Sequence, residues 1–376
     1  MRSLFHRSDS HFNSTKLVAR PIVVALLYND IPLVETGEDP IDLSPEALGF
    51  TPYFDLEDVP AEQEYTNIEH ALVDAGYKVA SYNVKDRFER LFKFLARRKI
   101  DVIFNLVEFF HGRPEQEMHV ASFYELLEMP YTGAPPMTLA LCQNKPMAKA
   151  ILRSFELPTP RSVTIRTMAD FKSRHNLHYP LIVKPACEDG SGGIENASIV
   201  TSLEDLRART EYVLNDFKMD ALIEEYIEGR ELNVAVLGNG DARRVLPISE
   251  IEFGGMPEHL YKIVSYQAKW DPMHEAYHKT IPSCPADLPP NITEYAQQLA
   301  LSATDALGTR DYARVDMRMN KDGELFILEV NPNPNLSEGT GIARSAEAAG
   351  IAFKDLLGTI VESAMERGKH RGVEPG

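Results

Sequence analysis

The 376-residue chain lacks the features that mark secreted and membrane proteins. Its three cysteines, Cys142, Cys187 and Cys284, form no Cys-x-x-Cys pair and cannot all be bridged, which suits a reducing compartment. The longest apolar run near the start, Ile22 to Leu27, is far shorter than the roughly 20 residues that a membrane-spanning helix needs. These absences predict a cytoplasmic protein that does not enter a membrane.

Basic residues are also scarce, because 39 Lys and Arg face 56 Asp and Glu and leave a formal net charge of −17. Such a surface repels phosphate backbones and anionic lipid headgroups, so we expect neither nucleic acid nor a membrane as a partner. Residues 31–64 contain ten acidic residues and no Lys, Arg or His. We interpret them as a solvated acidic insertion, with a lid or a collar that attracts a cationic substrate as the alternative. Residues 1–20 are expected to be a flexible tail, with a transit peptide as the alternative.

Strands and helices alternate over residues 21–140. Continuous or alternating apolar residues predict strands at residues 22–28, 78–84 and 100–107. Apolar residues at helical spacing predict helices at residues 65–75, 88–95 and 120–127. This order predicts a doubly wound parallel sheet in a Rossmann-like N-terminal domain.

The rest of the chain mixes helices with strands. Asn144 is expected to cap a helix that continues to about Glu156, and a new unit begins near there. Further helices are predicted near residues 202–215, 291–307 and 338–366. Strands are predicted at residues 181–185 and 221–227 and within 231–253 and 311–331.

Residues 311–331 predict a β-hairpin with one charged face and one apolar face. If Asp322-Gly323 forms a two-residue turn, Asp316 lies directly opposite Glu329. The other opposed pairs are then Arg314 with Asn331 on the same face, and Val315 with Val330, Met317 with Leu328 and Met319 with Phe326 on the apolar face.

The charged face of this hairpin indicates a metal site. Two carboxylates directly across a ladder repel each other, and a divalent Mg²⁺ or Mn²⁺ removes that conflict while Asn331 adds a neutral oxygen. The alternative is a solvated polar face on which Arg314 neutralises the acids.

Two further segments have the composition of a nucleotide site. Lys184 ends an apolar strand and is followed by the loop Asp189-Gly-Ser-Gly-Gly193, whose backbone N–H groups can approach phosphate oxygens. The loop matches neither the P-loop nor the dinucleotide fingerprint, and an ordinary turn is the alternative. Residues 222–231 run from one strand into the next, so this linker can offer backbone groups to adenine and carboxylates to adenine and ribose. The alternative is an acidic interdomain loop.

One motif points to different chemistry. His274-Glu275-Ala-Tyr-His278 satisfies the zinc-peptidase pattern His-Glu-x-x-His, whose mechanism needs a helix that places both histidines on one face. Pro272 and Pro282 leave room for about two turns, so we expect a chance match.

Taken in order, these segments resemble the ATP-grasp superfamily, and specifically D-alanine-D-alanine ligase, over about residues 21–366. The resemblance is carried by the segments Tyr131-Thr132-Gly133, Asn144-Lys145, Tyr179 to Pro185, Glu224 to Glu231, Ala268-Lys269-Trp270, Ala313 to Asp316 and Glu329-Val330-Asn331. It implies a mixed α/β enzyme with three domains, at residues 21–140, 141–228 and 229–376, the last two being α+β ATP-grasp subdomains. It also implies an ATP-dependent ligase that joins a carboxylate to an amine through an acylphosphate, with ATP and Mg²⁺ or Mn²⁺ as cofactors.

The resemblance assigns a role to each matching residue. It implies that the phosphates contact Lys145, Lys184, Lys269 and the loop residues Gly190, Ser191, Gly192 and Gly193. It implies that adenine is held at Glu224, Tyr226 and Ile227, and ribose at Glu231. It implies that the metal ligands are Asp316, Glu329 and Asn331, and that Arg314 stabilises the oxyanion of the transition state.

The segments that would bind amino acids depart from the family pattern. The family's Gly-Gly, Ser and Glu after the first strand are absent at Leu27 to Asp30, Gly190 replaces a loop serine, and Trp270 replaces the tyrosine that pairs with that serine. The candidate substrate contacts are His111, Gln116, Trp270, Asn335 and Ser337. We therefore expect small-molecule partners, a carboxylate and an amine that are amino acids other than the D-alanine pair, and we also consider a homodimer. Two hypotheses of other classes are a non-catalytic ATP-binding homologue and the zinc peptidase.

Overall fold

The computed structural model describes residues 20–30, 61–97, 99–173 and 176–370. The expected tail, except for Arg20, and most of the expected acidic insertion lie outside these residues. Within the described residues, the strands form three sheets. None of the described helices combines the length and the apolar character needed to cross a bilayer.

The first sheet is parallel, with the strand order β2-β1-β3. Its strands are β1 (Val23–Tyr28), β2 (Lys78–Asn83) and β3 (Val102–Leu106), and its helices are α2 (Ala61–Asp74), α3 (Phe88–Arg97) and α4 (Glu117–Leu126). Val24 and Leu26 pack toward α2 on one face of β1, whereas Ala25 and Leu27 pack toward α3 and α4 on the other. Both faces are covered, which confirms the predicted doubly wound sheet.

The second sheet is antiparallel, with the strand order β4-β7-β5-β6. Its strands are β4 (Ser162–Ile165), β5 (Leu181–Pro185), β6 (Ile199–Val200) and β7 (Ala221–Glu225). Helices α5 (Pro136–Gln143) and α6 (Lys145–Ser154) precede it, and α7 (Leu203–Tyr212) continues into the π-helical turn η3 (Val213–Phe217). The Asn144 side chain accepts a hydrogen bond from the Met147 N–H at 3.1 Å, which confirms the predicted cap of α6.

The third sheet has the order β11-β10-β8-β12-β13, with β9 paired to β8. Its strands are β8 (Gly229–Leu237), β9 (Arg244–Val245), β10 (Ser249–Glu252), β11 (Ile281–Ser283), β12 (Tyr312–Asn320) and β13 (Leu325–Asn331). Its helices are α8 (Tyr266–Trp270), α9 (Glu275–His278), α10 (Pro290–Leu307), α11 (Gly341–Ala348) and α12 (Phe353–His370). Short 3₁₀ turns complete the chain at η1 (Pro114–Gln116), η2 (Asn196–Ser198) and η4 (Gly240–Ala242).

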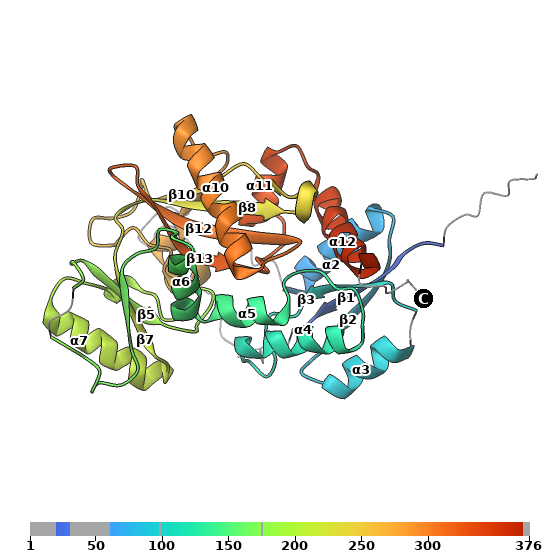
Figure 1. Cartoon of the computed structure of the whole chain (residues 1–376), viewed down its shortest axis with the longest axis horizontal. Helices are drawn as coiled ribbons and strands as arrows, with labels where there is room; N and C mark the ends of the chain where they lie inside the picture. Colours follow the sequence, from blue (N-terminus) through green and yellow to red (C-terminus); the bar gives the residue numbers. More distant parts are fainter. Residues whose placement is uncertain (1–19, 31–60, 98, 174–175, 371–376) are drawn as a thin grey trace, which may run out of the picture.

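The three sheets are spread along the long axis of the molecule (Figure 1). The β5–β7 sheet with α7 lies at one end, the parallel sheet with α3 and α4 lies at the other, and β8, β12 and β13 lie with α10 on the upper side between them. Each sheet falls within one predicted domain, although the domain boundaries stay predictions. Helix α12 returns to the parallel sheet, where Leu357 and Val361 share a core cluster with Leu26 and Phe104. The end of the described chain therefore completes the core of its beginning.

The predicted hairpin forms, but its register differs from the prediction near the turn. Asp316 pairs with Glu329 and Arg314 with Asn331, as predicted. The turn is one residue longer than predicted, because the Asn320 N–H bonds to the Glu324 carbonyl and Gly323 takes a φ of +80°. A β-bulge between Asp316 and Met317 then shifts the ladder back by one residue. The predicted pairs Met317 with Leu328 and Met319 with Phe326 are therefore wrong, and the observed partners are Ile327 and Leu325.

The first and third sheets meet at a buried aspartate. Asp311, which is fully buried, accepts hydrogen bonds from the Gly133 N–H at 2.9 Å, from Asn239 Nδ2 at 2.7 Å and from Arg367 Nε at 2.9 Å. Gly133 is needed here because its φ is +91° and because a Cβ at this position would lie 2.3 Å from Asn333 Oδ1. Asp311 thus ties the Tyr131-Thr-Gly133 segment to β12 and α12.

This arrangement predicts a large loss of stability in Asp311→Ala. The change leaves Arg367 without its carboxylate partner and removes the acceptor of two further donors, so we expect the free energy of unfolding to fall by about 3–5 kcal/mol. Urea unfolding measures the loss, and Lys321→Ala in the exposed hairpin turn is the control, with an expected change within about 0.5 kcal/mol. Equal midpoints for the two variants would contradict the structural role of Asp311.

Candidate active site

A buried carboxylate between two lysines lies at the centre of the site. Glu224 on β7 contacts Lys184 of β5, with Nζ to Oε2 at 2.6 Å, and Lys149 of α6, with Nζ to Oε1 at 2.8 Å. All three side chains are at most 7% exposed. Burial raises the pKa of Glu224, but Lys149 and Lys184 outweigh burial and hold the pKa below its usual value. Glu224 is a single carboxylate paired with two ammonium groups, so this three-residue cluster keeps a net positive charge.

Lys149 is a member of this cluster that the sequence analysis missed. Its Nζ also donates to the Leu328 carbonyl at 2.8 Å, inside the bulge of β13. Burial lowers the pKa of Lys149 to about 8, the cost of enclosing the second cation. The available signal was its spacing of four residues from Lys145, which places both lysines on one face of α6. The sequence alone does not show that this face is buried.

The charged face of the hairpin is fully hydrogen-bonded around Asp316. Arg314 donates to both oxygens of Asp316, from Nε at 2.7 Å and from Nη2 at 2.8 Å. Asn233 on β8 and Asn331 on β13 donate to the same carboxylate at 2.7 and 2.9 Å. Neutralisation by Arg314, which the sequence analysis weighed against a metal, is therefore present in this structure. Asn233 is an additional contact that sequence reasoning did not find.

Glu329 differs from its strand partner, because it has no hydrogen bond within the described residues. The nearest cation is Lys145, whose Nζ lies 3.9 Å from Oε2, and the Glu329 side chain is 35% exposed. Burial raises the pKa of Glu329, but Lys145, Lys184 and Arg314 outweigh it and keep the pKa low. The carboxylate is thus ionised and accessible.

The donor set at this point fits a divalent hard cation. Glu329 offers free oxygens, and Asn331 uses its amide nitrogen toward Asp316, so its amide oxygen can face an ion. An ion bound to Asp316 has to replace at least one of the donors that now occupy its oxygens. No group of three His, Cys, Asp or Glu suited to a metal occurs in the described chain, so the metal site as predicted depends on the amide oxygen of Asn331.

The glycine-rich loop packs against Trp270. The indole Nε1 donates to the Gly190 carbonyl at 2.7 Å, and Lys269 Nζ lies 5.1 Å from the centroid of the indole ring. Ser191 donates to the Val264 carbonyl at 2.9 Å. Gly193 has a φ of +69°, and a Cβ there would lie 2.7 Å from Pro185. Gly190 and Trp270, where the resemblance led us to expect a serine and a tyrosine, therefore contact each other through a backbone carbonyl and the indole N–H.

The linker between β7 and β8 presents a free backbone donor. The Ile227 N–H has no hydrogen bond among the described residues, whereas the neighbouring Tyr226 N–H bonds to the Pro180 carbonyl at 3.0 Å. Glu231 pairs with Arg318 at 2.9 Å, and Arg318 also packs over the Tyr226 ring. Burial raises the pKa of Glu231 despite this arginine. Arg318, which the sequence analysis missed, holds the predicted ribose contact in place.

A separate pocket collects residues from five parts of the chain. It is lined by Glu64, Glu108, Glu117, Tyr312, Asn335 and Ser337, among others. Ser337 Oγ donates to Glu64 at 2.8 Å. Of the predicted substrate contacts, Asn335 and Ser337 line this pocket, whereas His111 and Gln116 do not. The His111 backbone has a φ of +54°, and its exposed ring lies 3.6 Å from Asp86.

Glu64 was not among the predicted site residues, because it does not directly follow the first strand in the sequence. The structure places it in the first turn of α2, the next described element after β1. In the sequence, the acidic segment separates Glu64 from the first strand, although α2 is the next described element after β1. Glu108 and Glu117 carry no recognisable signal beyond their position after β3.

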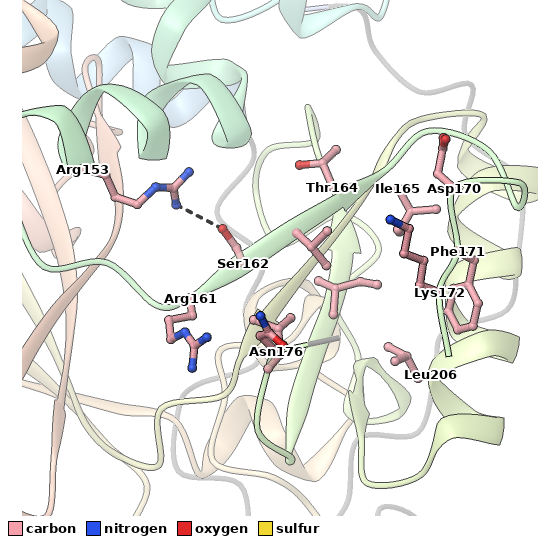
Figure 2. A pocket seen from close by; sticks show the side chains of 13 residues that line it. Arg153, Arg161, Ser162, Thr164, Ile165, Asp170, Phe171, Lys172, Asn176 and Leu206 are labelled. Carbon is pink, nitrogen blue, oxygen red and sulfur yellow. Dashed lines mark hydrogen bonds between the residues drawn. The ribbon is translucent and has the colours of Figure 1, made fainter. Parts of the chain in front are cut away.

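A further cavity of about 490 Å³ lies beside β4 at the edge of the second sheet (Figure 2). Arg153, Arg161 and Lys172 lie around it together with apolar side chains such as Phe171, and Arg153 donates to Ser162 at 3.2 Å. It contains none of the predicted site residues.

The His-Glu-x-x-His motif does not form a zinc site. His274 precedes the four-residue helix α9 and caps it, with Nδ1 accepting from the Ala276 N–H at 3.1 Å. His278 is fully buried, and its Nε2 lies 2.8 Å from the Pro272 carbonyl. The helix is too short to place both imidazoles on one face.

The chain is similar to proteins of known sequence and structure. Residues 151–362 match a family model described as the D-ala D-ala ligase C-terminus. A D-alanine–D-alanine ligase of Desulfotalea psychrophila is 33% identical over 305 residues, which make up 80% of this chain and 89% of that protein. An uncharacterized protein of Sinorhizobium fredii is 32% identical over 276 residues, 73% of this chain and 78% of that protein.

The fold is also shared. A crystal structure of D-alanine–D-alanine ligase from Bacillus anthracis matches with a TM-score of 0.70 and 24% identity, and the match covers 93% of this chain and 100% of that chain. The structure of the same enzyme complexed with ATP matches with a TM-score of 0.69 and 22% identity.

The contact between Trp270 and the loop predicts the effect of Trp270→Phe. The variant keeps an aromatic ring but loses the indole N–H, so we expect amide exchange in residues 189–193 to become about fivefold faster, which corresponds to about 1 kcal/mol. Hydrogen exchange read by mass spectrometry measures the rate. Tyr266→Phe in the same short helix is the control, and an equal change in both variants would contradict the contact.

The pocket carboxylates predict a pH dependence. Burial raises the pKa of Glu117 to about 8, despite a hydrogen bond from Asn333 Nδ2 at 2.7 Å, whereas the unfolded chain has a value of about 4.3. A raised folded pKa contributes stability that is complete below the unfolded pKa and is lost as the pH rises through about 8. Between pH 5 and pH 8, the unfolding midpoint of the wild type should therefore fall more than that of Glu117→Gln. Parallel midpoints in urea would refute this.

Proposed function

Because this chain belongs to the D-alanine–D-alanine ligase family of ATP-grasp proteins, we propose that it joins two amino acids through an acylphosphate intermediate, with a substrate pair other than two D-alanines. Membership of the family supports an ATP-dependent carboxylate–amine ligase that forms carbon–nitrogen bonds. The mechanism and the substrate pair are the parts that we propose.

The observation that supports this function most is the charge arrangement between the second and third sheets. Lys145, Lys184 and Arg314 surround Glu329, which has no hydrogen bond of its own within the described chain. Such a site is suited to the terminal phosphates of ATP, because lysines balance the phosphate charge while carboxylate and amide oxygens hold a metal. Asp316, Glu329 and Asn331 are the proposed ligands. When bound, Mg²⁺ or Mn²⁺ supplies positive charge to the phosphate oxygens.

The other end of the nucleotide is proposed to lie along the linker after β7. The free Ile227 N–H can donate to the adenine ring, and Glu231 can accept from ribose hydroxyls. Glu224 is 1% exposed and held by two lysines, so we propose that it acts by fixing Lys184 and Lys149 rather than by direct contact with adenine. The loop from Gly190 to Gly193 is proposed to cover the phosphates together with Lys269.

The proposed reaction has two bond-forming steps. A carboxylate oxygen of the first substrate attacks the γ-phosphorus, and the bond to ADP breaks. The amine nitrogen of the second substrate then attacks the acyl carbon, loses a proton, and releases inorganic phosphate. Arg314 lies beside Asp316, one of the proposed metal ligands, and is proposed to stabilise the oxyanion of the second step. The homodimer and the cytoplasmic location expected from the sequence stay predictions.

One observation favours a non-catalytic ATP-binding protein as the second candidate. Both oxygens of Asp316 are occupied by Arg314, Asn233 and Asn331, which is the arrangement of a neutralised structural carboxylate. The two candidates differ in turnover, because a binding protein releases no phosphate with any pair of amino acids.

The proposal predicts that ATP consumption yields ADP and phosphate and requires the metal ligands. In a screen of D- and L-amino-acid pairs, Asp316→Asn and Glu329→Gln should each lower turnover by at least about 100-fold, because the phosphate charge loses its metal. Glu324→Gln, an exposed change in the same hairpin, is the control. AMP and pyrophosphate as products, or unchanged rates in both ligand variants, would contradict the proposed mechanism.

A further inference from the structure

The bulge in β13 decides which face of the third sheet carries two of the proposed metal ligands. On the side of the turn, Met317 pairs with Ile327, and beyond the bulge Asp316 pairs with Glu329. Leu328 is therefore the extra residue, which has no strand partner within the described chain. Bulges next to functional sites commonly redirect the side chains that follow them.

A ladder without this bulge would place the ligands on opposite faces. Side chains alternate along a strand, so a shift by one residue moves each of them to the other face. If the pairing near the turn continued without interruption, Asp316 would lie opposite Leu328. Glu329 and Asn331 would then turn toward the apolar face. In the structure, Asn331 instead donates to Asp316 from Nδ2 at 2.9 Å, so the bulge is what brings these residues together.

Lys149 binds the carbonyl of the extra residue. Helix α6 lies against β13 (Figure 1), and Lys149 Nζ donates to the Leu328 carbonyl at 2.8 Å. Because β13 is the last strand of its sheet in the described chain, no further strand there can bind the bulge. The Ile327 N–H, just before the bulge, donates to the Pro158 carbonyl at 2.8 Å. Contacts from α6 and from the segment after it thus take the place of a neighbouring strand.

Charge balance alone does not account for Lys149. Its Nζ lies 2.8 Å from Glu224 Oε1, and both side chains are 1% exposed. Lys184 already pairs with the same carboxylate at 2.6 Å, and one ammonium group neutralises one carboxylate. Enclosing a second ammonium group costs free energy, and burial lowers the pKa of Lys149 to about 8 for that reason. The hydrogen bond to the Leu328 carbonyl gives the second lysine a separate role.

We infer that Lys149 is a positioning residue that fixes the bulge at Leu328. The bulge in turn keeps Glu329 and Asn331 on the face that carries Asp316. This inference rests on the proposed function, in which those three residues hold the divalent metal. Without the ammonium group, the ladder beyond the bulge either opens or slips, and a slip brings the Glu329 carboxylate to the apolar face. Both outcomes separate the metal ligands.

Lys149→Met tests the inference in the full-length chain, because methionine has nearly the same length but cannot donate a hydrogen bond. Mn²⁺ is added with a non-hydrolysable ATP analogue, and the enhancement of water proton relaxation reports the ion that the protein holds. We expect the dissociation constant of Mn²⁺ to rise at least about tenfold. The loss of a nearby cation would by itself favour Mn²⁺, so the direction of the change separates positioning from charge.

Arg153→Met is the matched control. Arg153 lies one turn further along α6, is exposed, and donates to Ser162 at 3.2 Å rather than to β13. This variant should leave the dissociation constant of Mn²⁺ unchanged.

Deletion of Leu328 provides a rescue that a merely structural lysine would not show. Without the extra residue, the pairing near the turn continues as a regular ladder and still places Glu329 opposite Asp316. The deletion should therefore return the dissociation constant of Lys149→Met to within about threefold of the wild type. The deletion alone should stay within the same range. Should Lys149→Met not fold, the deletion alone decides, since retained Mn²⁺ binding supports the inference and lost binding overturns it.

Hydrogen exchange measures the bulge without any ligand. Amides of residues 327–331 should exchange at least about tenfold faster in Lys149→Met than in the wild type, and the deletion should restore slow exchange. Unfolding midpoints show whether each variant is folded.

The outcomes separate this inference from the proposed function. Mn²⁺ binding without phosphate release for any pair of amino acids rejects the ligase proposal alone. A wild type that binds no Mn²⁺ rejects the proposed metal ligands, and hydrogen exchange then decides whether Lys149 fixes the bulge. In a wild type that binds Mn²⁺, unchanged or tighter binding by Lys149→Met overturns the inference. Unchanged exchange in residues 327–331, or no recovery on deletion of Leu328, overturns it as well.

Discussion

The ion cluster of Glu224 with Lys149 and Lys184 is the interaction on which the site depends. Enclosing these three charges costs several kcal/mol each, and only close pairing offsets that cost. The pairing fixes α6 against β5 and β7, and Lys149 extends it to β13 through the Leu328 carbonyl. Lys149 and Lys184 are therefore held in place by the fold itself, so the proposed binding of phosphate charge beside Lys184 needs little reorganisation.

The hairpin shows how far sequence reasoning reaches. The alternation of charged and apolar residues correctly predicted that Asp316 and Glu329 share one face, and their direct pairing is observed. The assumed turn was one residue too short, and an unforeseen bulge at Leu328 compensated for that error. The alternation of apolar and polar residues along β12 determines which face of the sheet each side chain takes, because one face is buried. The position of a bulge depends instead on what the unpaired residue contacts. Here the contact is Lys149, which lies far away in the sequence.

The pocket that contains Asn335 and Ser337 was less accessible to prediction for the same reason. The pocket combines five parts of the chain: the start of α2, the end of β3 with the residues after it, the start of α4, the start of β12 and the segment after β13. No local pattern links Glu64, Glu108 and Tyr312, and the acidic insertion separated Glu64 from the strand after which it was sought. The pair Gly190 and Trp270 was seen as a loss of the family's contact, whereas the indole N–H replaces it with a bond to a backbone carbonyl. Residue identity alone does not reveal such an exchange.

The candidate site and the pocket beside α2 differ in their ionisable groups. Lys145, Lys184 and Arg314 act on Glu329, whereas Glu64, Glu108 and Glu117 line the pocket. Lys269 and Asp189 lie where the two regions meet, since Lys269 lowers the pKa values of both Glu108 and Glu329, and Asp189 acts on both Glu108 and Arg314. In the proposed reaction, a change at Lys269 or Asp189 therefore alters the electrostatic potential at both places at once.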